Sequence, residues 1–158
     1  MFVKSIKVMG AAALSAAILS LGFGVPANAL DYEAKAKGTI PVTISIANVK
    51  SGTTPLYISV QKRSEYQGIK GFGNILKATS SGTMTTTVKV DVADEYAVSL
   101  WHDLNNDGIF SMTKDYKILD GWGASGNVPK NRAPVFDDVK IRVPSSGQAV
   151  NVEMVYPS

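Results

Sequence analysis

Apolar residues recur at every second position in several short stretches of this chain, and that alternation constrains the fold more than any other feature. The first stretch carries Ile40, Val42, Ile44 and Ile46, with smaller or polar residues between them. Successive side chains of a β-strand point to opposite faces, so a period of two indicates a strand with one buried face. The same alternation returns at 56–60, 84–92, 96–101, 139–143 and 150–156.

Serine and glycine clusters such as Ser80-Ser81-Gly82 separate these stretches and indicate turns. A further short strand is predicted over 116–119, whereas the glycine-rich region 64–81 is interpreted as a loop. No helical period follows residue 29. We therefore expect an all-β chain, an antiparallel β-sandwich of about seven strands that is immunoglobulin-like or transthyretin-like. A small closed barrel is the alternative.

Residues 1–29 have the pattern of a secretory signal peptide. Lys4 and Lys7 precede an uncharged stretch rich in Ala, Leu and Gly, and the small residues Ala27-Asn28-Ala29 end it. A transmembrane anchor is the alternative, since the apolar run is about long enough to cross a bilayer. We expect cleavage, which would place the mature protein in the periplasm or outside the cell.

The mature chain is interpreted as a flexible tail over 30–37 and a single domain over 38–158. The chain has no cysteine, which excludes disulfides, thiolate catalysis and Cys-ligated metals, and its one histidine excludes multi-histidine sites. Its net charge of +3 comes mostly from two lysines in the leader; without them 14 basic residues face 13 acidic ones. We expect no nucleic-acid partner and no stable membrane span after cleavage.

One acidic loop carries the chemistry that the sequence offers. Asp103, Asn105 and Asp107 fall at alternate positions and Gly108 follows, which matches the opening of a calcium-binding loop. Short oxygen-bearing side chains at this spacing can converge on one Ca²⁺ ion, and the carbonyl of Ile109 can add another oxygen. Lys114 occupies the position where an EF-hand has its bidentate Glu, so an EF-hand is excluded. Asp115 or Asp120 would have to close the shell; the alternative is a turn whose side chains bond their own backbone.

Two further residues are candidates for ligand binding. Trp122 stands between two glycines in a long connection, where it can serve as a stacking platform or cover an open end of the sandwich. His102 next to Asp103 suggests hydrolysis, but neighbouring strand residues point to opposite faces and no nucleophile elbow accompanies them.

Three motifs follow one another along the chain. The strand Tyr96–Trp101 leads into His102-Asp103 and the Asn/Asp/Gly loop, the Gly-rich segment 121–127 comes next, and Pro134-Val135-Phe136-Asp137-Asp138 ends the series. In this order they resemble a bacterial exported family catalogued as domain of unknown function 2141, over roughly residues 38 to 157. The resemblance implies an exported β-sandwich and no established activity.

These observations leave hypotheses from different classes. We expect a non-catalytic binding or structural protein, with Ca²⁺ at the 103–108 loop as the cofactor it would hold. The alternatives are a hydrolase or other enzyme centred on His102 with Asp103, Asp137 or Asp138, and a small-ligand or carbohydrate-binding module that uses Trp122.

Overall fold

The computed structural model describes residues 33–34, 38–68, 70–114 and 117–158. The predicted signal peptide lies outside the described residues. The elements are β1 (Glu33–Ala34), β2 (Ile40–Val49), β3 (Pro55–Gln61), β4 (Lys70–Lys77), β5 (Gly82–Val90), β6 (Asp94–His102), β7 (Gly121–Ala124), α2 (Phe136–Val139), β8 (Lys140–Val143) and β9 (Gln148–Glu153). Among the described residues, no helix is long and apolar enough to cross a membrane.

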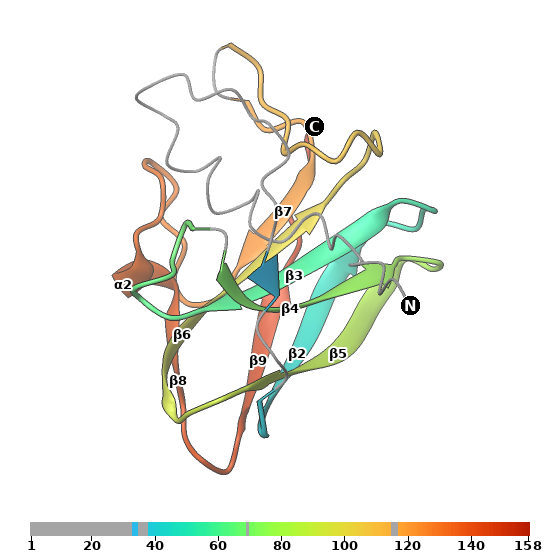
Figure 1. Cartoon of the computed structure of the whole chain (residues 1–158). Helices are drawn as coiled ribbons and strands as arrows, with labels where there is room; N and C mark the ends of the chain where they lie inside the picture. Colours follow the sequence, from blue (N-terminus) through green and yellow to red (C-terminus); the bar gives the residue numbers. More distant parts are fainter. Residues whose placement is uncertain (1–32, 35–37, 69, 115–116) are drawn as a thin grey trace, which may run out of the picture.

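Two sheets form a sandwich, which confirms the predicted fold class (Figure 1). The larger sheet has the order β1-β4-β3-β6-β7, and β8 also pairs with β6. β8 lies along Asp94–Ala97 and β7 along Ser99–His102, so the two short strands share one side of β6. The smaller sheet has the order β5-β2-β9. Most pairs are antiparallel, but β2 pairs in parallel with β9, and β1 with β4.

The predicted alternation places one face of each sheet in the core. Val42, Ile44 and Ile46 of β2 are fully buried, and they share a cluster with Ile58 of β3 and Leu100 of β6. Burying a side chain of this size contributes about 1.5–3 kcal/mol relative to leaving it exposed, so this cluster supplies the main driving force for folding.

β6 is buried on both faces, because a second layer covers the outer side of the larger sheet. On that side Trp101 is fully buried and stacks on Tyr57, with ring centroids 4.5 Å apart. Phe110, from the loop after β6, meets Trp101 edge-on at 6.2 Å. The loop between β6 and β7 is therefore held against the sheet by an aromatic cluster.

Five segments differ from the expectations. β4 falls in the region interpreted as a loop and β7 in the Gly-rich segment, so both strands were missed. Of the predicted strand over 116–119, residue 116 lies outside the described residues, and among the described ones Ile118 forms an isolated bridge to Met112. Within the predicted tail, Glu33–Ala34 form the short strand β1. The one-turn helix α2 directly precedes β8, although no helix was expected after residue 29.

Candidate functional site

The acidic loop begins where β6 ends. The side chains of His102 and Asp103, the two neighbouring candidates at this point, lie on opposite faces of the sheet. His102 is the last residue of β6 and contacts Tyr156 near the C-terminal end of the chain. Asp103 turns into the loop, where it is 1% exposed, and its N–H donates to the carbonyl of Pro55 at 3.1 Å. The two side chains therefore contact different groups, as the alternation of side chains along a strand predicts.

The carboxylate of Asp103 organises a tight turn. Its Oδ1 accepts the N–H of Asp107 at 3.2 Å, and its Oδ2 accepts the N–H of Gly108 at 2.9 Å. Asn105 also accepts the Asp107 N–H and donates from Nδ2 to Asp107 Oδ2 at 2.6 Å. Asn106 and Gly108 have φ values of 58° and 73°, a left-handed conformation that Asn and Gly tolerate best. The side chains thus fix the backbone of the turn that carries them.

Asp120, 1% exposed, attaches the far end of the loop to the same place. Its Oδ1 accepts the N–H of Leu104 at 3.0 Å, while its Oδ2 accepts the N–H of Ser111 at 2.9 Å and the indole N–H of Trp101 at 3.2 Å. One buried carboxylate therefore joins the start, the middle and the end of the loop.

The carboxylate of Asp103 is repelled by those of Asp107 and Asp120. Burial raises the pKa of the Asp103 carboxyl above its ordinary value, and the charges of Asp120 and Asp107 raise it further. The N–H groups of Gly108 and Asp107 act in the opposite direction. Within the described part of the chain, none of the three carboxylates forms an ion pair with Lys or Arg.

The structure gathers most of the predicted calcium ligands in one turn. Ile109 donates its N–H to Asp107 Oδ1 at 2.8 Å, and its carbonyl accepts the Ser111 hydroxyl at 3.2 Å. Asp115 lies outside the described residues. Among the residues that are described, no group of three or more His, Asp or Glu side chains is arranged to hold a metal ion. A cation here would need Asn105 and main-chain oxygens as well as carboxylates.

Both ring nitrogens of His102 meet hydroxyl groups. Nδ1 lies 2.9 Å from the Tyr156 hydroxyl and Nε2 lies 3.1 Å from the Thr54 hydroxyl. The Tyr156 oxygen already accepts the N–H of Lys50 at 3.0 Å, so its own hydrogen is available for Nδ1. Burial lowers the pKa of the imidazole, and the charge of Asp120 opposes this only in part. His102 thus serves as a neutral structural link between β6 and the C-terminal segment.

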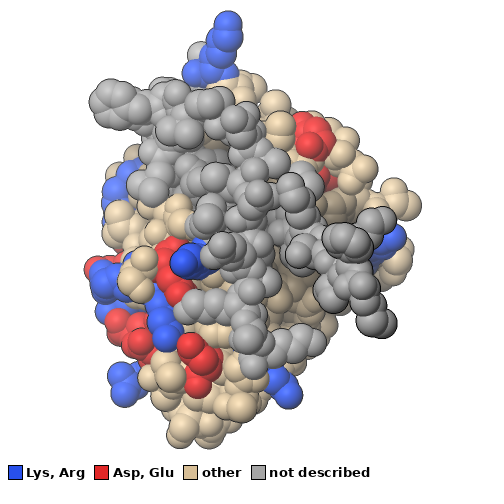
Figure 2. Space-filling model, in the orientation of Figure 1, with Lys and Arg blue, Asp and Glu red and all other residues tan. Residues whose placement is uncertain are grey.

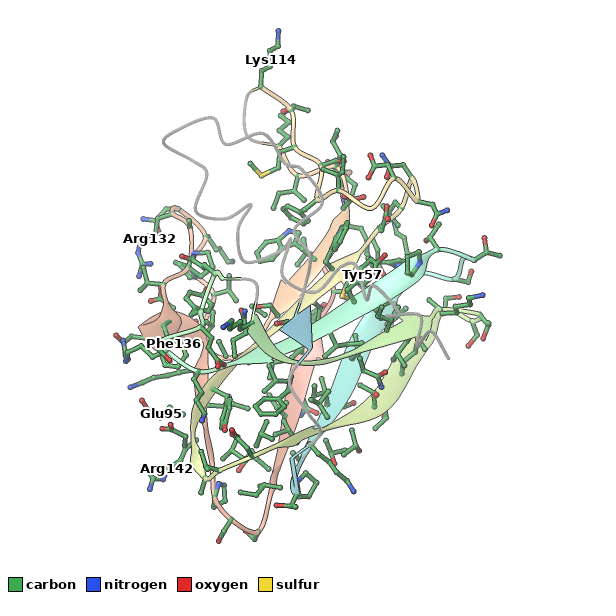
Figure 3. All side chains as sticks on the ribbon, in the orientation of Figure 1. Tyr57, Glu95, Lys114, Arg132, Phe136 and Arg142 are labelled. Carbon is green, nitrogen blue, oxygen red and sulfur yellow. The ribbon has the colours of Figure 1, made fainter. Side chains whose placement is uncertain are left out.

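The carboxylates that an enzyme centred on His102 would need lie elsewhere. Asp137 pairs with Arg63 and with Lys140 at 3.2 Å, and Asp138 pairs with Arg132 at 2.6 Å. These pairs surround α2, whose Phe136 packs in a cluster with Ala97 near the opposite end of β6. Figure 3 shows Arg132, Phe136 and Glu95 along this side, and Figure 2 shows acidic and basic side chains intermixed there. The arrangement is a set of exposed ion pairs.

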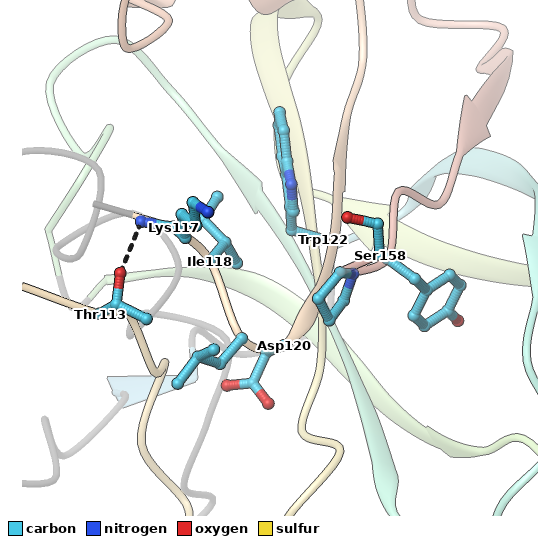
Figure 4. A pocket seen from close by; sticks show the side chains of 9 residues that line it. Thr113, Lys117, Ile118, Asp120, Trp122 and Ser158 are labelled. Carbon is cyan, nitrogen blue, oxygen red and sulfur yellow. Dashed lines mark hydrogen bonds between the residues drawn. The ribbon is translucent and has the colours of Figure 1, made fainter. Parts of the chain in front are cut away.

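A pocket of about 480 Å³ lies beside the far end of the acidic loop (Figure 4). Trp122 of β7 forms one wall, and the C-terminal segment forms another. The lining residues are Thr113, Lys117, Ile118, Leu119, Asp120, Trp122, Tyr156, Pro157 and Ser158. The volume falls within the range of about 300–1,000 Å³ found for small-molecule sites. Of the predicted candidates, Trp122 and Asp120 meet here.

The glycines on both sides of Trp122 allow the C-terminal segment to pass close to β7. A Cβ atom at Gly121 would lie 2.4 Å from the ring of Tyr156, and one at Gly123 would lie 2.6 Å from the carbonyl of Glu153. Trp122 itself exchanges two main-chain hydrogen bonds with Val155, at 2.9 and 2.7 Å. The Gly-Trp-Gly pattern is therefore required by a close crossing of two segments.

Sequence reasoning missed most of the pocket. Lys117, Thr113 and the C-terminal residues lie far apart along the chain, and no local pattern relates them to Trp122. Tyr156 was predicted only as the end of the last strand. The single usable signal was the pair of glycines around Trp122, which indicates a crowded backbone without naming the partner.

The comparisons with known proteins identify the family and nothing more specific. The family model described as an uncharacterized protein conserved in bacteria (DUF2141) matches residues 44–151, and no curated protein and no solved structure matches. The matched range runs from β2 to β9 and includes the acidic loop, β7 and α2. The chain therefore belongs to the family catalogued as domain of unknown function 2141.

Proposed function

We propose that the protein is an exported, non-catalytic β-sandwich that binds a small ligand in the pocket beside Trp122. The observation that carries the proposal is a pocket of suitable volume with an aromatic wall, built from the end of the acidic loop and the C-terminal segment. The rigid sheet positions one side of the pocket and loops supply the rest, an arrangement that many binding proteins use. Export follows from the expected signal peptide, to the periplasm or beyond.

The absence of catalysis is part of this proposal. Hydrolysis by a histidine needs a base whose other nitrogen is oriented by a partner, and a nucleophile or water within reach. His102 is buried, and its two nitrogens meet Thr54 and Tyr156. Asp137 and Asp138 are engaged with basic side chains near α2.

Ligand titrations followed by tryptophan fluorescence test the pocket. The chain has two tryptophans, and Trp101 is fully buried, so a ligand in the pocket should change mainly the emission of Trp122. We would titrate glucose, glucuronate and benzoate to about 10 mM, a concentration that detects affinities of about 4 kcal/mol. Trp122→Ala should abolish the response, while Val135→Ala, a truncation of an exposed side chain away from the pocket, should keep it. A response to none of these compounds, by fluorescence and by calorimetry, would refute the proposed binding.

The acidic loop supports calcium binding as a second candidate function. The carboxylates of Asp107 and Asp120 repel that of Asp103, and within the described residues none of the three forms an ion pair with a cationic side chain. A divalent cation at Asp103, Asn105, Asp107 and the Ile109 carbonyl would relieve this repulsion. Extracellular calcium modules bind with dissociation constants of about 10⁻⁴–10⁻³ M.

Thermal unfolding in calcium tests this second candidate. If Ca²⁺ binds only the folded state in this range, 10 mM Ca²⁺ should add about 1.4–2.7 kcal/mol of stability. Asp107→Asn should remove the gain and Asp94→Asn should keep it, because both aspartates are exposed and only Asp107 belongs to the loop. An equal gain in 10 mM Mg²⁺, or no gain in the wild type, contradicts a calcium site.

A further inference from the structure

The polar groups that face the pocket differ in whether they remain available to a ligand. Asp120 is the only acidic side chain among the described lining residues, and its carboxylate already accepts three N–H groups. In Figure 4 this carboxylate points away from the ring of Trp122. Its negative charge is thus directed into the loop and is offset by N–H donors there.

Two of the groups that remain available can only donate hydrogen bonds. Lys117 lines the pocket and is exposed, and within the described residues its ammonium group has no ion-pair partner. The indole N–H of Trp122, which is half-buried, likewise has no hydrogen-bond partner in that part of the chain. A lysine ammonium and an indole N–H can donate but cannot accept. The Thr113 oxygen accepts the N–H of Lys117 at 3.1 Å, which leaves its hydrogen free to donate.

The apolar part of the pocket is lined by one aromatic and three aliphatic side chains. Trp122 offers an aromatic face, and Ile118, Leu119 and Pro157 supply apolar surface around it. A flat or weakly puckered six-membered ring can lie against an indole, whose face is the most extended apolar surface that a single side chain provides.

We propose that the ligand of this pocket is a six-membered ring that bears a carboxylate, with the ring against Trp122 and the carboxylate toward Lys117. This inference rests on the proposed function and specifies its ligand. A carboxylate accepts hydrogen bonds and therefore complements the two lining groups that can only donate, the Lys117 ammonium and the Trp122 indole N–H. A uronic acid and an aromatic acid share this chemistry, so the test includes one of each.

Isothermal titration calorimetry at pH 7 and low salt compares glucuronate, glucose and benzoate on the purified protein. We expect at least one of the two acids to bind about fivefold more tightly than glucose, which is the effect of one partly exposed charge pair. Lys117→Gln should remove this preference. Lys130→Gln, which removes an exposed lysine that does not line the pocket, should leave it unchanged. Added salt should weaken the binding of the acids and not that of glucose.

The outcomes separate the two proposals. If glucose binds as tightly as both acids, or if Lys117→Gln keeps the preference, the carboxylate inference is wrong and the pocket remains a binding site. If none of the three compounds binds, the proposed function fails together with its ligand. Binding of benzoate alone identifies an aromatic acid, and binding of glucuronate alone identifies an acidic sugar.

Discussion

Removing the carboxylate of Asp120 is the most informative perturbation, because one side chain holds the loop closed. Its two oxygens accept N–H groups of Leu104, Ser111 and Trp101 at 2.9–3.2 Å. Asp120→Ala leaves all three donors without their acceptor. A buried donor that loses its partner costs about 1–3 kcal/mol, and water entering from the adjoining pocket can replace part of this loss. We therefore expect a decrease of about 3 kcal/mol in the free energy of unfolding.

Asp120→Asn keeps the shape of the side chain and reduces the number of hydrogen bonds that it can accept, so it measures the contribution of the hydrogen bonds separately. An amide has one acceptor oxygen and one donor group. Its oxygen can face Trp101 and Ser111, which leaves only the N–H of Leu104 opposite a second donor. We expect a loss of about 1–2 kcal/mol, so the order of stability is wild type, then Asn, then Ala.

Urea unfolding at pH 7 measures both variants, with Asp94→Ala as the matched control. Asp94 is exposed and accepts one N–H, from Glu95 at 2.8 Å, so its removal should change stability by less than about 0.5 kcal/mol. Near-ultraviolet circular dichroism should also change in Asp120→Ala, because the indole of Trp101 loses its hydrogen bond. If Asp120→Ala stays within about 0.5 kcal/mol of the wild type, the loop is not held by this carboxylate.

Three further variants test other parts of the structure. Burial lowers the pKa of His102 below 6.5, so the stability it contributes is present above pH 6.5 and is lost as the pH falls through its pKa in the folded state. Between pH 7.5 and 5, the wild type should therefore lose more stability in urea titrations than His102→Gln; an equal loss contradicts a buried neutral imidazole. Gly121→Ala brings a Cβ within 2.4 Å of the Tyr156 ring and should cost about 1–3 kcal/mol in thermal unfolding, whereas Gly52→Ala, with no atom closer than 3.7 Å, should cost less. Ile44→Ala should cost about 2–5 kcal/mol in the same assay, because Ile44 is fully buried between the sheets; a cost under 1 kcal/mol would place it outside the core.

The strands that could be predicted from the sequence are those whose burial alternates. β2 carries Val42, Ile44 and Ile46 on its inner face, so the period of two is visible without a structure. β4 was missed because Gly71 and Gly73 occupy positions where other strands have side chains. Gly73 pairs with Ser59 on β3. When the partner strand is unknown, a glycine within a strand is interpreted as part of a turn. β7 was missed for a related reason. Its glycines are required by the close passage of the C-terminal segment, which cannot be seen from the local sequence.

In the candidate site, contacts between residues close in sequence could be predicted, whereas contacts between distant residues could not. The spacing of Asp103, Asn105 and Asp107 predicts a tight loop, because the contacts that form it span five residues or fewer. The contact between Asp120 and Trp101 spans 19 residues and depends on the register of β7 along β6. The contact between His102 and Tyr156 spans 54 residues and depends on how the last strand returns. Neither of these two contacts produces a recognisable pattern in the sequence.

The three motifs of this chain all pack against β6. The acidic loop places Phe110 against Trp101, and the segment after β7 inserts the buried hydroxyl of Ser125 between Val98 and Val139. The Pro-x-Phe segment places Phe136 in a cluster with Ala97. These contacts give each of the three motifs a part in packing against β6.

The pocket lies beside β7, at the far end of the acidic loop. Trp122 forms one wall of the pocket, and the lining residues that lie outside all three motifs include Thr113, Lys117, Ile118 and Leu119. Lys117 is the only cationic side chain among the described lining residues, so exchanging it tests the proposed ligand more directly than exchanging any residue of the acidic loop.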